Sequence, residues 1–320
     1  MRYLSGIQPS GTPHLGNYFG AMRQHVARQS LGECFFFIAD LHALTTVHDA
    51  AAMRAYTREL ATDYLAVGID PERAVFFRQS DVPEVPELTW ILSTVTPMGL
   101  LERCHSYKDK VAKGIEASHG LFAYPVLMAA DILIYDSHRV PVGEDQIQHV
   151  EVTRDIAGYF NRAYGEILVL PEHEVEPTTR LVPGVDGKKM SKSYGNTLEM
   201  FAPEKELKKR VMAITTDSKA VGEPKDPEGN TIFQLYRLMA SPQETEAMAE
   251  RFREGGYGYG DAKKELLAKI LDHFAPYRRR REELLSDPAR VEAVLRDGAR
   301  RARAVARATL DRVRKAVGLE

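Results

Sequence analysis

The sequence predicts an α/β fold, a doubly wound parallel sheet followed by a smaller all-helical part. In the first half of the chain, short apolar runs alternate with helix-like segments, which is typical of parallel sheets with crossover helices. After residue 195 the pattern becomes helical and polar, through segments 203–214, 231–239 and 261–286. With 320 residues, 44% of them hydrophobic, the chain is long enough for two domains or one large domain with an appendage.

Five strands are expected. Residues 34–39 and 74–77 are continuous apolar runs, which suit strands buried on both faces of a sheet. The other strands are expected at residues 3–7, 140–142 and 167–170. Since ligands gather at the carboxyl ends of parallel strands, the motifs that follow these strands are candidate functional residues.

Helices are expected between the strands, at residues 18–24, 53–67 and 145–162. Gly68 suits the left-handed residue that ends a helix, and Pro288 suits the first turn of a last one. The alternation breaks between residues 82 and 120, where the only tryptophan, Trp90, lies in an apolar helix-like stretch.

The overall net charge is −2, which does not by itself indicate a nucleic-acid-binding protein. Residues 276–320, however, hold 13 Lys and Arg against 7 Asp and Glu, while the rest of the chain carries a net −8. This basic end could contact phosphates, or it could be a solvated helix face.

The two cysteines, Cys34 and Cys104, lie far apart. They favour a reducing compartment, and they argue against a disulfide framework or a zinc site. Two cysteines also exclude a four-cysteine iron–sulfur cluster. No signal peptide starts the chain and no apolar run approaches the roughly 20 residues of a membrane span, so we expect a cytoplasmic protein without membrane contact.

Residues 8–17 (QPSGTPHLGN) form the first polar motif, between the first strand and a helix. Helix N-termini bind phosphate through unpaired N–H groups and the helix dipole. Gly16 allows close approach to the backbone, and His14 and Asn17 can donate hydrogen bonds on one side of the helix start. A structural capping histidine would look the same.

Residues 187–196 (GKKMSKSYGN) form the second motif, a run of three lysines and two serines around Met190. Lysine supplies a mobile positive charge, and the glycines leave the backbone free to direct its N–H groups at an anion. The loop suits a polyphosphate, although a solvated surface loop is the alternative.

Together, the two motifs resemble the two signatures of the class I aminoacyl-tRNA synthetases. Residues 14–17 match His-Ile-Gly-His, with Asn17 in place of the second histidine, and residues 189–193 match Lys-Met-Ser-Lys-Ser at every position. Within that class, the chain resembles the bacterial tryptophanyl-tRNA synthetases almost from end to end. The segments that carry this resemblance are 5–11, 40–45, 124–131, 140–146 and 297–299.

The resemblance implies a Rossmann-like catalytic domain at 1–185, with a connective insertion at 82–120 that makes a dimer contact. A buried internal helix is the alternative for that insertion. It further implies a mobile loop at 186–195, a helical domain for the tRNA anticodon at 196–280, and a C-terminal helix at 281–320 that packs back toward the catalytic domain.

The implied reaction is ATP-dependent activation of L-tryptophan to tryptophanyl-adenylate, then transfer to the 3′ end of tRNA(Trp). ATP would come with Mg²⁺, no metal would be held by protein side chains, and the protein would be a homodimer. Lys189, Lys192, His14 and Asn17 would be catalytic. ATP would be bound by Gln8, Ser10, Gly16, Asn17, Gly143, Asp145, Lys189, Met190, Ser191 and Lys192.

Three assignments keep an alternative. Lys108 and Lys110 would add phosphate contacts or lie on a solvated face. Asp145 would accept from the ribose hydroxyls or cap a helix. His42 would lie at the edge of the site or in the core.

Asp131 is the main indication of the amino-acid substrate, because it is a lone carboxylate in an apolar helix-like stretch and is costly to bury without a partner. An indole N–H would be such a partner, with Met128 on the same helix face. A buried structural hydrogen bond is the alternative. By resemblance, tryptophan would be bound by Leu4, Gln8, Tyr124, Met128, Asp131, Val140, Val142 and Gln146.

Three rival functions remain. A tyrosyl-tRNA synthetase would share the fold and the chemistry, although Asp131 and Met128 favour tryptophan. A catalytically silent paralogue would serve in regulation or binding, and intact motifs argue against silence. A small nucleotidyltransferase would share the first motif, but the long helical part after residue 195 suits tRNA better.

Overall fold

The computed structural model describes residues 1–104, 118–175 and 182–320, apart from the side chain of Asp145. Five parallel strands form one sheet in the order β3-β2-β1-β4-β5. The strands are β1 Arg2–Ile7, β2 Glu33–Ile38, β3 Ala74–Arg78, β4 Arg139–Val142 and β5 Glu172–Val175. The first four agree with the sequence prediction, so the expected doubly wound parallel sheet is confirmed.

The fifth strand was predicted wrongly at 167–170, and the actual strand β5 begins at Glu172. The apolar run is held by the preceding helix instead of by the sheet. The Asn161 side chain accepts from Ile167 N and Leu168 N at 3.1 and 2.9 Å, and it donates to Leu168 O at 2.8 Å. A side chain that satisfies these backbone groups removes the need for a strand partner.

Alternate residues of the central strands face opposite sides of the sheet, and both sides are buried. In β2, Phe36 belongs to one core, whereas Phe35 and Phe37 belong to the other. The first core is covered by helices from the N-terminal third, and the second by the insertion and the helices after it. The former are α1 Leu15–Asn17, the π-helical turn η1 Tyr18–Met22, α2 Arg23–Arg28 and α4 Ala50–Val67; the latter are α5 Glu84–Ser93, α6 Met98–Glu102, α8 His119–Leu133 and α9 Ile147–Tyr164.

Local residues set the ends of the longer helices, and several short helical turns lie in the connections between elements. Asp49 caps α4 by accepting from Ala52 N, and Gly68 ends it with φ +116°, as predicted. The helix expected at 145–162 is α9, which starts only at Ile147 because a 3₁₀ turn precedes it. The short turns are α3 Asp40–Ala43, η2 Gln79–Asp81, η3 Glu144–Gln146 and η4 Lys192–Tyr194.

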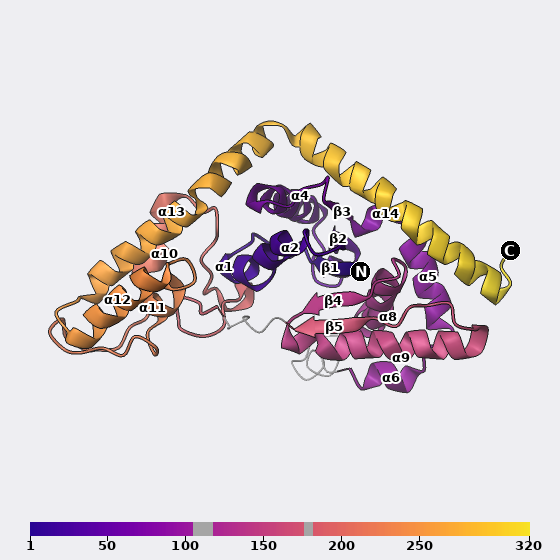
Figure 1. The fold of residues 1–320 in the computed structure, drawn as a ribbon, viewed down its shortest axis with the longest axis horizontal. Helices are drawn as coiled ribbons and strands as arrows, with labels where there is room; N and C mark the ends of the chain where they lie inside the picture. The colour runs from indigo at the N-terminus through magenta and orange to yellow at the C-terminus, as the bar shows by residue number, and fades with distance from the viewer. Residues whose placement is uncertain (105–117, 176–181) are drawn as a thin grey trace.

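The C-terminal part is helical. Its helices are α10 Glu204–Met212, α11 Thr231–Tyr236, α12 Pro242–Glu254, α13 Tyr259–Ser286 and α14 Pro288–Val317. Helix α12 was not predicted, although Ser241 and Glu244 form a capping box at its start. The long helices α13 and α14 form an inverted V whose apex lies at Asp287, and Asp287 caps α14 by accepting from Arg290 N (Figure 1).

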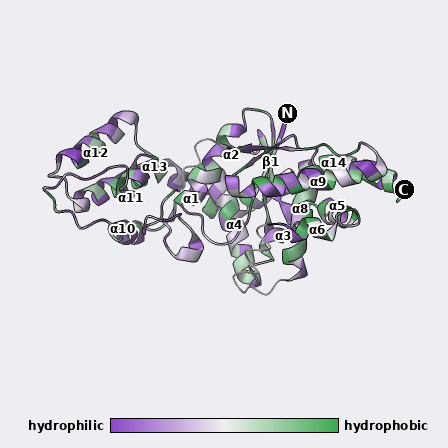
Figure 2. Ribbon diagram, turned by 90° about the horizontal axis from the view of Figure 1, so that it is seen from below, coloured by the Kyte–Doolittle hydropathy of each residue, from purple (hydrophilic) through white to green (hydrophobic). Residues whose placement is uncertain are grey.

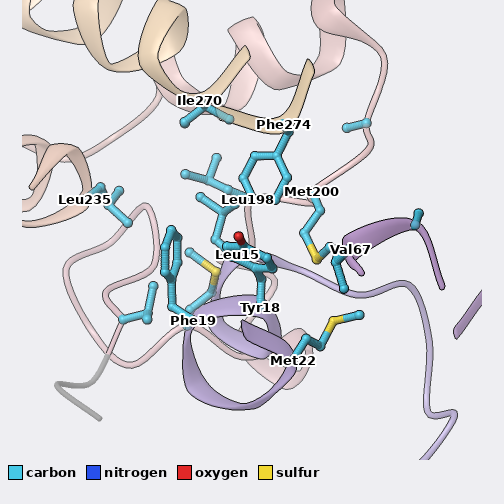
Figure 3. Close-up of a cluster of buried hydrophobic side chains, with 14 of the residues drawn as sticks. Leu15, Tyr18, Phe19, Met22, Val67, Leu198, Met200, Leu235, Ile270 and Phe274 are labelled. Atoms are coloured by element: carbon cyan, nitrogen blue, oxygen red, sulfur yellow. The ribbon is translucent and has the colours of Figure 1, made fainter. Parts of the chain in front are cut away.

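A buried cluster joins the first motif to the helical part. Leu15 and Tyr18 lie against Leu198 and Met200 from the chain after the basic loop, and Phe274 of α13 covers them (Figure 3). A backbone hydrogen bond joins the same two segments, since Leu15 N donates to Leu198 O at 2.8 Å. Both motifs are therefore packed on one core that also includes the helical part.

Helix α14 returns to the sheet and crosses the edge strand β3. Its first half contributes Val291 and Leu295 to one core, and its second half contributes Ala302 and Leu310 to the other. A Cβ at Gly298 would lie 1.8 Å from Phe76 O, so only glycine allows this contact between helix and strand backbone. Hydrophobic and hydrophilic residues alternate along the helices (Figure 2). Among the described residues, no helix is both long and apolar enough to cross a membrane.

Candidate active site

A cavity of about 340 Å³ opens at the carboxyl ends of β1 and β4. Strands β2 and β4 lie on either side of β1, so this is the point where the strand order reverses. Ligands of doubly wound sheets bind at such a point.

The cavity brings together all eight residues that were predicted to bind the amino acid, although they come from strands, a helix and two loops. They are Leu4, Gln8, Tyr124, Met128, Asp131, Val140, Val142 and Gln146. Gly143, predicted for ATP, lines the same cavity. The structure also adds a wall that the sequence did not indicate, formed by Gly20, Ala21, Gln24 and His25 after the first motif.

Asp131 lines this cavity and is only 2% exposed. The sequence suggested a lone carboxylate, but two side chains contact it in the structure. Gln79 Nε2 donates to both of its oxygens at 2.8 Å, and His42 Nε2 lies 2.8 Å from Oδ2. Burial raises the pKa of Asp131, while the hydrogen bonds from His42 and Gln79 act in the opposite direction. A carboxylate offers about four acceptor sites, so these contacts leave room for a further donor.

Gln79 was missed in the sequence. Its Oε1 accepts from Leu41 N at 3.1 Å and from His42 N at 3.4 Å, so one amide fixes both Asp131 and the turn that carries His42. Gln79 itself is 1% exposed. His42, for which the sequence left two interpretations, is buried and at the same time lines the cavity.

Tyr124 lines the cavity from α8, about two helical turns before Asp131. Its hydroxyl is hydrogen-bonded to His149 Nε2, and its ring lies edge-on to His42 at a centroid distance of 6.3 Å. Met128, one turn further along α8, is half-buried. The cavity is thus mainly apolar, with Asp131 as its buried charge-bearing group.

The first motif forms a tight turn into α1. His14 N donates to Asn17 Oδ1 at 3.1 Å, so Asn17 caps the turn instead of pointing freely outward. The His14 ring is buried, and its Nδ1 has no hydrogen-bond partner in the structure. Burial and then the charge of Lys192 lower the pKa of His14 to about 4, so the ring is neutral at pH 7. A Cβ at Gly16 would lie 2.9 Å from that ring, which explains the glycine.

The two motifs meet through Lys192. Its Nζ donates to Gly11 O at 2.7 Å, across 181 positions of sequence. Gly11 has φ +124°, a left-handed conformation that side chains rarely adopt. Burial lowers the pKa of Lys192, and the nearby Glu59 and Glu199 act against that shift.

The basic loop is built around Asn196, a second residue whose role the sequence did not reveal. Its side chain accepts from Ser191 N at 2.8 Å and donates to Lys189 O and Asp186 Oδ1 at 3.1 and 2.8 Å. Met190 is buried in the core, and Met190 N donates to Val182 O. The loop therefore has a fixed base, while Lys189 is exposed.

The remaining residues that were predicted to contact ATP or phosphate do not line the cavity or lie outside the described residues. Ser10 is exposed, and Ser191 Oγ lies 2.8 Å from Ser193 Oγ. Lys108, Lys110 and the Asp145 side chain lie outside the described residues. Within the described part of the chain, no group of three or more His, Cys, Asp or Glu side chains is arranged to hold a metal ion.

The chain is similar to known proteins over most or all of its length. The family model described as tRNA synthetases class I (W and Y) matches residues 1–275. A tryptophan–tRNA ligase of Rhodopirellula baltica is 56% identical over the whole of both chains. The crystal structure of Campylobacter jejuni tryptophanyl-tRNA synthetase complexed with ADP and tryptophan is 49% identical, covers 99% of this chain and 100% of its own, and has a TM-score of 0.95.

A tyrosyl-tRNA synthetase of Archaeoglobus fulgidus shares the fold, with a TM-score of 0.64 over 88% of this chain and 90% of its own, but only 20% identity. The two bacterial tryptophan enzymes named above match far more closely, at 56% and 49% identity over the full length. The chain belongs to the class I tRNA synthetases, and within them to the bacterial tryptophanyl-tRNA synthetases.

Proposed function

We propose that the cavity binds L-tryptophan, that ATP binds beside it between the two motifs, and that the products are tryptophanyl-adenylate and pyrophosphate. The aminoacyl group then passes to the 3′ end of tRNA(Trp). The observation that carries the proposal is the position of Asp131, a buried carboxylate in a mainly apolar cavity that Gln8 of the first motif also lines.

The indole N–H would donate to Asp131. A buried acceptor aimed at one ring position selects for a substrate with a donor there, because a substrate without it leaves the acceptor unpaired. Met128, Leu4, Val140 and Val142 would contact the ring faces, and Gln8, Tyr124 and Gln146 would bind the ammonium and carboxylate of the amino acid.

The activation step needs no protein nucleophile, because the tryptophan carboxylate itself attacks the α-phosphate of ATP. Catalysis then consists of positioning and of stabilising the negative charge that develops on the phosphates. An ammonium group has three donors, and Lys192 gives one of them to Gly11 O. We infer that the others bind the pyrophosphate moiety, joined by the exposed Lys189.

His14 would contribute as a neutral donor. A ring whose pKa lies at about 4 carries no charge at pH 7, so it can sit beside Lys192 without repulsion. Its unpaired Nδ1 is available for a phosphate oxygen when it carries the proton. The Asn17 side-chain nitrogen and Gly143 would complete the nucleotide site. Mg²⁺ would arrive on the ATP phosphates, which are its preferred ligands.

We further propose a homodimer formed through the insertion at 82–120. Trp90 of α5 is 73% exposed and Met98 of α6 is 62% exposed, while Leu88 and Leu92 on the opposite side of α5 are buried. Large exposed apolar side chains on one segment mark interaction sites. The alternative interpretation of Trp90 as an internal core residue does not agree with its exposure.

We also propose that residues 1–185 are the catalytic domain, that 186–195 are the mobile loop, that 196–280 bind the anticodon and that 281–320 return to the catalytic domain. Charge at the C-terminal end and the helical part after the basic loop support this division. An enzyme that uses ATP and tRNA would work in the cytoplasm.

The test is ATP–pyrophosphate exchange measured with each of the twenty amino acids, with and without tRNA. Exchange that depends on tryptophan alone supports the proposal. Exchange with tyrosine would indicate the tyrosyl enzyme, and no exchange with any amino acid would indicate a silent paralogue. Exchange with another acid would indicate a nucleotidyltransferase.

A further inference from the structure

A second hollow lies on α14 and shares no residue with the active-site cavity. It has a volume of about 410 Å³, and its lining contains four arginines and one carboxylate. The lining residues are Asp81, Arg296, Ala299, Arg300, Arg303, Ala304 and Arg307. We call it the arginine groove.

The four arginines stand on one face of the helix. Their spacing of four, three and four residues keeps them within about 60° of one another around the axis and spreads them over about 16 Å along it. The side chains of Arg296, Arg300 and Arg307 are 75%, 73% and 63% exposed. The other two residues of the helix that line the groove are small: Ala299 is buried and Ala304 is exposed.

The carboxylates nearby do not neutralise this row completely. Glu84 is buried and accepts from Arg303 at 3.0 to 3.2 Å, so Arg307 reaches the same carboxylate only at 3.4 Å. Glu292 accepts two bonds from Arg78, at 2.6 and 3.1 Å, so its contact with Arg296 is longer, at 3.3 Å.

Within the part of the chain that the structure describes, Arg300 pairs only with Asp297 of its own helix, at 2.7 Å, and both side chains are exposed. Exposed ion pairs of this kind stabilise a protein very little, so a phosphate can replace the carboxylate at little cost. Over its whole length, α14 has nine Lys and Arg against three Asp and Glu.

We propose that the arginine groove binds the phosphate backbone of the tRNA. Planar guanidinium groups match phosphate oxygens with two parallel hydrogen bonds, and a linear row matches the regular charge spacing of a nucleic-acid strand. The proposal rests on the proposed function, which supplies an RNA substrate.

The position of the groove supports this occupant. Asp81 ends the turn after β3, and Gln79 at the start of the same turn contacts Asp131 in the active-site cavity. The groove therefore reaches the same end of the sheet as the cavity, the end where the strands have their carboxyl termini. An RNA that delivers its 3′ end to the cavity passes with its backbone within reach of this edge, whereas its bases need not face the groove.

The test compares a double variant, Arg296→Gln with Arg300→Gln, with a matched control, Arg290→Gln with Lys315→Gln. The control removes two exposed charges from the same helix but outside the groove. Binding of tRNA is measured over a range of salt concentrations, and ATP–pyrophosphate exchange is measured without tRNA. Far-UV circular dichroism and thermal unfolding check the fold of both variants.

The groove variant should bind tRNA about tenfold more weakly, with a salt slope reduced by about two, one for each lost phosphate contact. Its exchange rate and its unfolding temperature should match those of the control. Unchanged tRNA binding, or an equal loss in the control, would overturn the proposal. So would unchanged tRNA binding with lost binding to anionic vesicles, which would point to a membrane surface. If the unmodified protein shows no exchange with tryptophan, the proposed function itself fails, and this can be recognised separately.

Discussion

Lys192 of the basic loop donates a hydrogen bond to the backbone oxygen of Gly11 in the first motif, at 2.7 Å. The contact joins the two motifs, and the His14 ring lies close enough for the lysine charge to lower its pKa.

Replacing Lys192 by alanine should lower the activation rate by about 10²–10³, because the lysine gains its phosphate contacts mainly in the transition state. Tryptophan affinity should hardly change. Lys188→Ala is the matched control, since Lys188 is an exposed lysine of the same loop. Pre-steady-state adenylate formation gives the rate, and equal losses of rate and tryptophan affinity would mean that Lys192 is structural.

Replacing Asp131 by alanine should remove the preference for tryptophan over phenylalanine, which can reach about 10⁴–10⁵ in a site built around a hydrogen bond. Asp131→Asn should lose less, because its amide oxygen can still accept. The measurement is kcat/KM for tryptophan, tyrosine and phenylalanine in each variant, with KM for ATP as the control. A variant that loses stability but keeps its preference would identify Asp131 as a structural carboxylate.

Gln79→Met should lower kcat/KM for tryptophan by about 10- to 100-fold, because hydrogen bonds to a charged group are worth about 1.5–3 kcal/mol. The methionine keeps the approximate shape but loses both contacts with Asp131. A double-mutant cycle with Asp131→Ala measures the coupling. If the two effects add, Gln79 does not act through Asp131.

Acid should destabilise the protein partly through His14. The unfolded ring takes up a proton near pH 6.5, and the folded ring only near pH 4. Since the unfolded state then binds more protons, this contribution to stability is complete above pH 6.5 and is lost as the pH falls toward 4. Urea unfolding at about pH 5 and pH 7.5 should show a smaller pH dependence in His14→Gln than in the unmodified protein. Equal dependence in both would show that His14 is protonated alike in the two states.

Trp90→Asp should convert a dimer into a monomer, because a charge in an apolar interface is left without a partner. Sedimentation velocity at micromolar concentration gives the mass. Leu31→Asp is the control, since Leu31 is also exposed, at 62%, but lies outside the insertion. A monomeric unmodified protein with full charging activity would contradict the proposed dimer.

Much of the fold could be predicted because its signals are local. Continuous apolar runs identified β2 and β3, and Gly68 and Pro288 marked helix ends. The fifth strand was misplaced because Asn161, a polar side chain on the preceding helix, satisfies the backbone of the more apolar run. Helix α12 was missed although its capping box is a local signal, because few of its residues are apolar.

In the candidate site, too, local signals could be predicted from the sequence, whereas contacts between distant residues could not. The two motifs and the cavity-lining segments are contiguous runs, and resemblance identified them. The partners of Asp131 could not be found in this way, because Gln79 and His42 are 52 and 89 positions away and meet it only after the sheet has formed. Asn196 belongs to the basic loop, but nothing in the sequence shows that its side-chain amide forms hydrogen bonds with the backbone of Ser191 and Lys189.

The close contact between Gly298 of α14 and the backbone of Phe76 in β3 affects how the chain folds during synthesis. The last helix covers β3, yet more than 200 residues separate the two along the chain. At about 5–20 residues per second, a ribosome needs roughly 10–40 s to make that stretch. Throughout this interval the edge of the catalytic sheet has no cover of its own and could pair with other chains. The nascent enzyme therefore depends on its final helix for protection from aggregation, and truncation there should affect solubility before it affects chemistry.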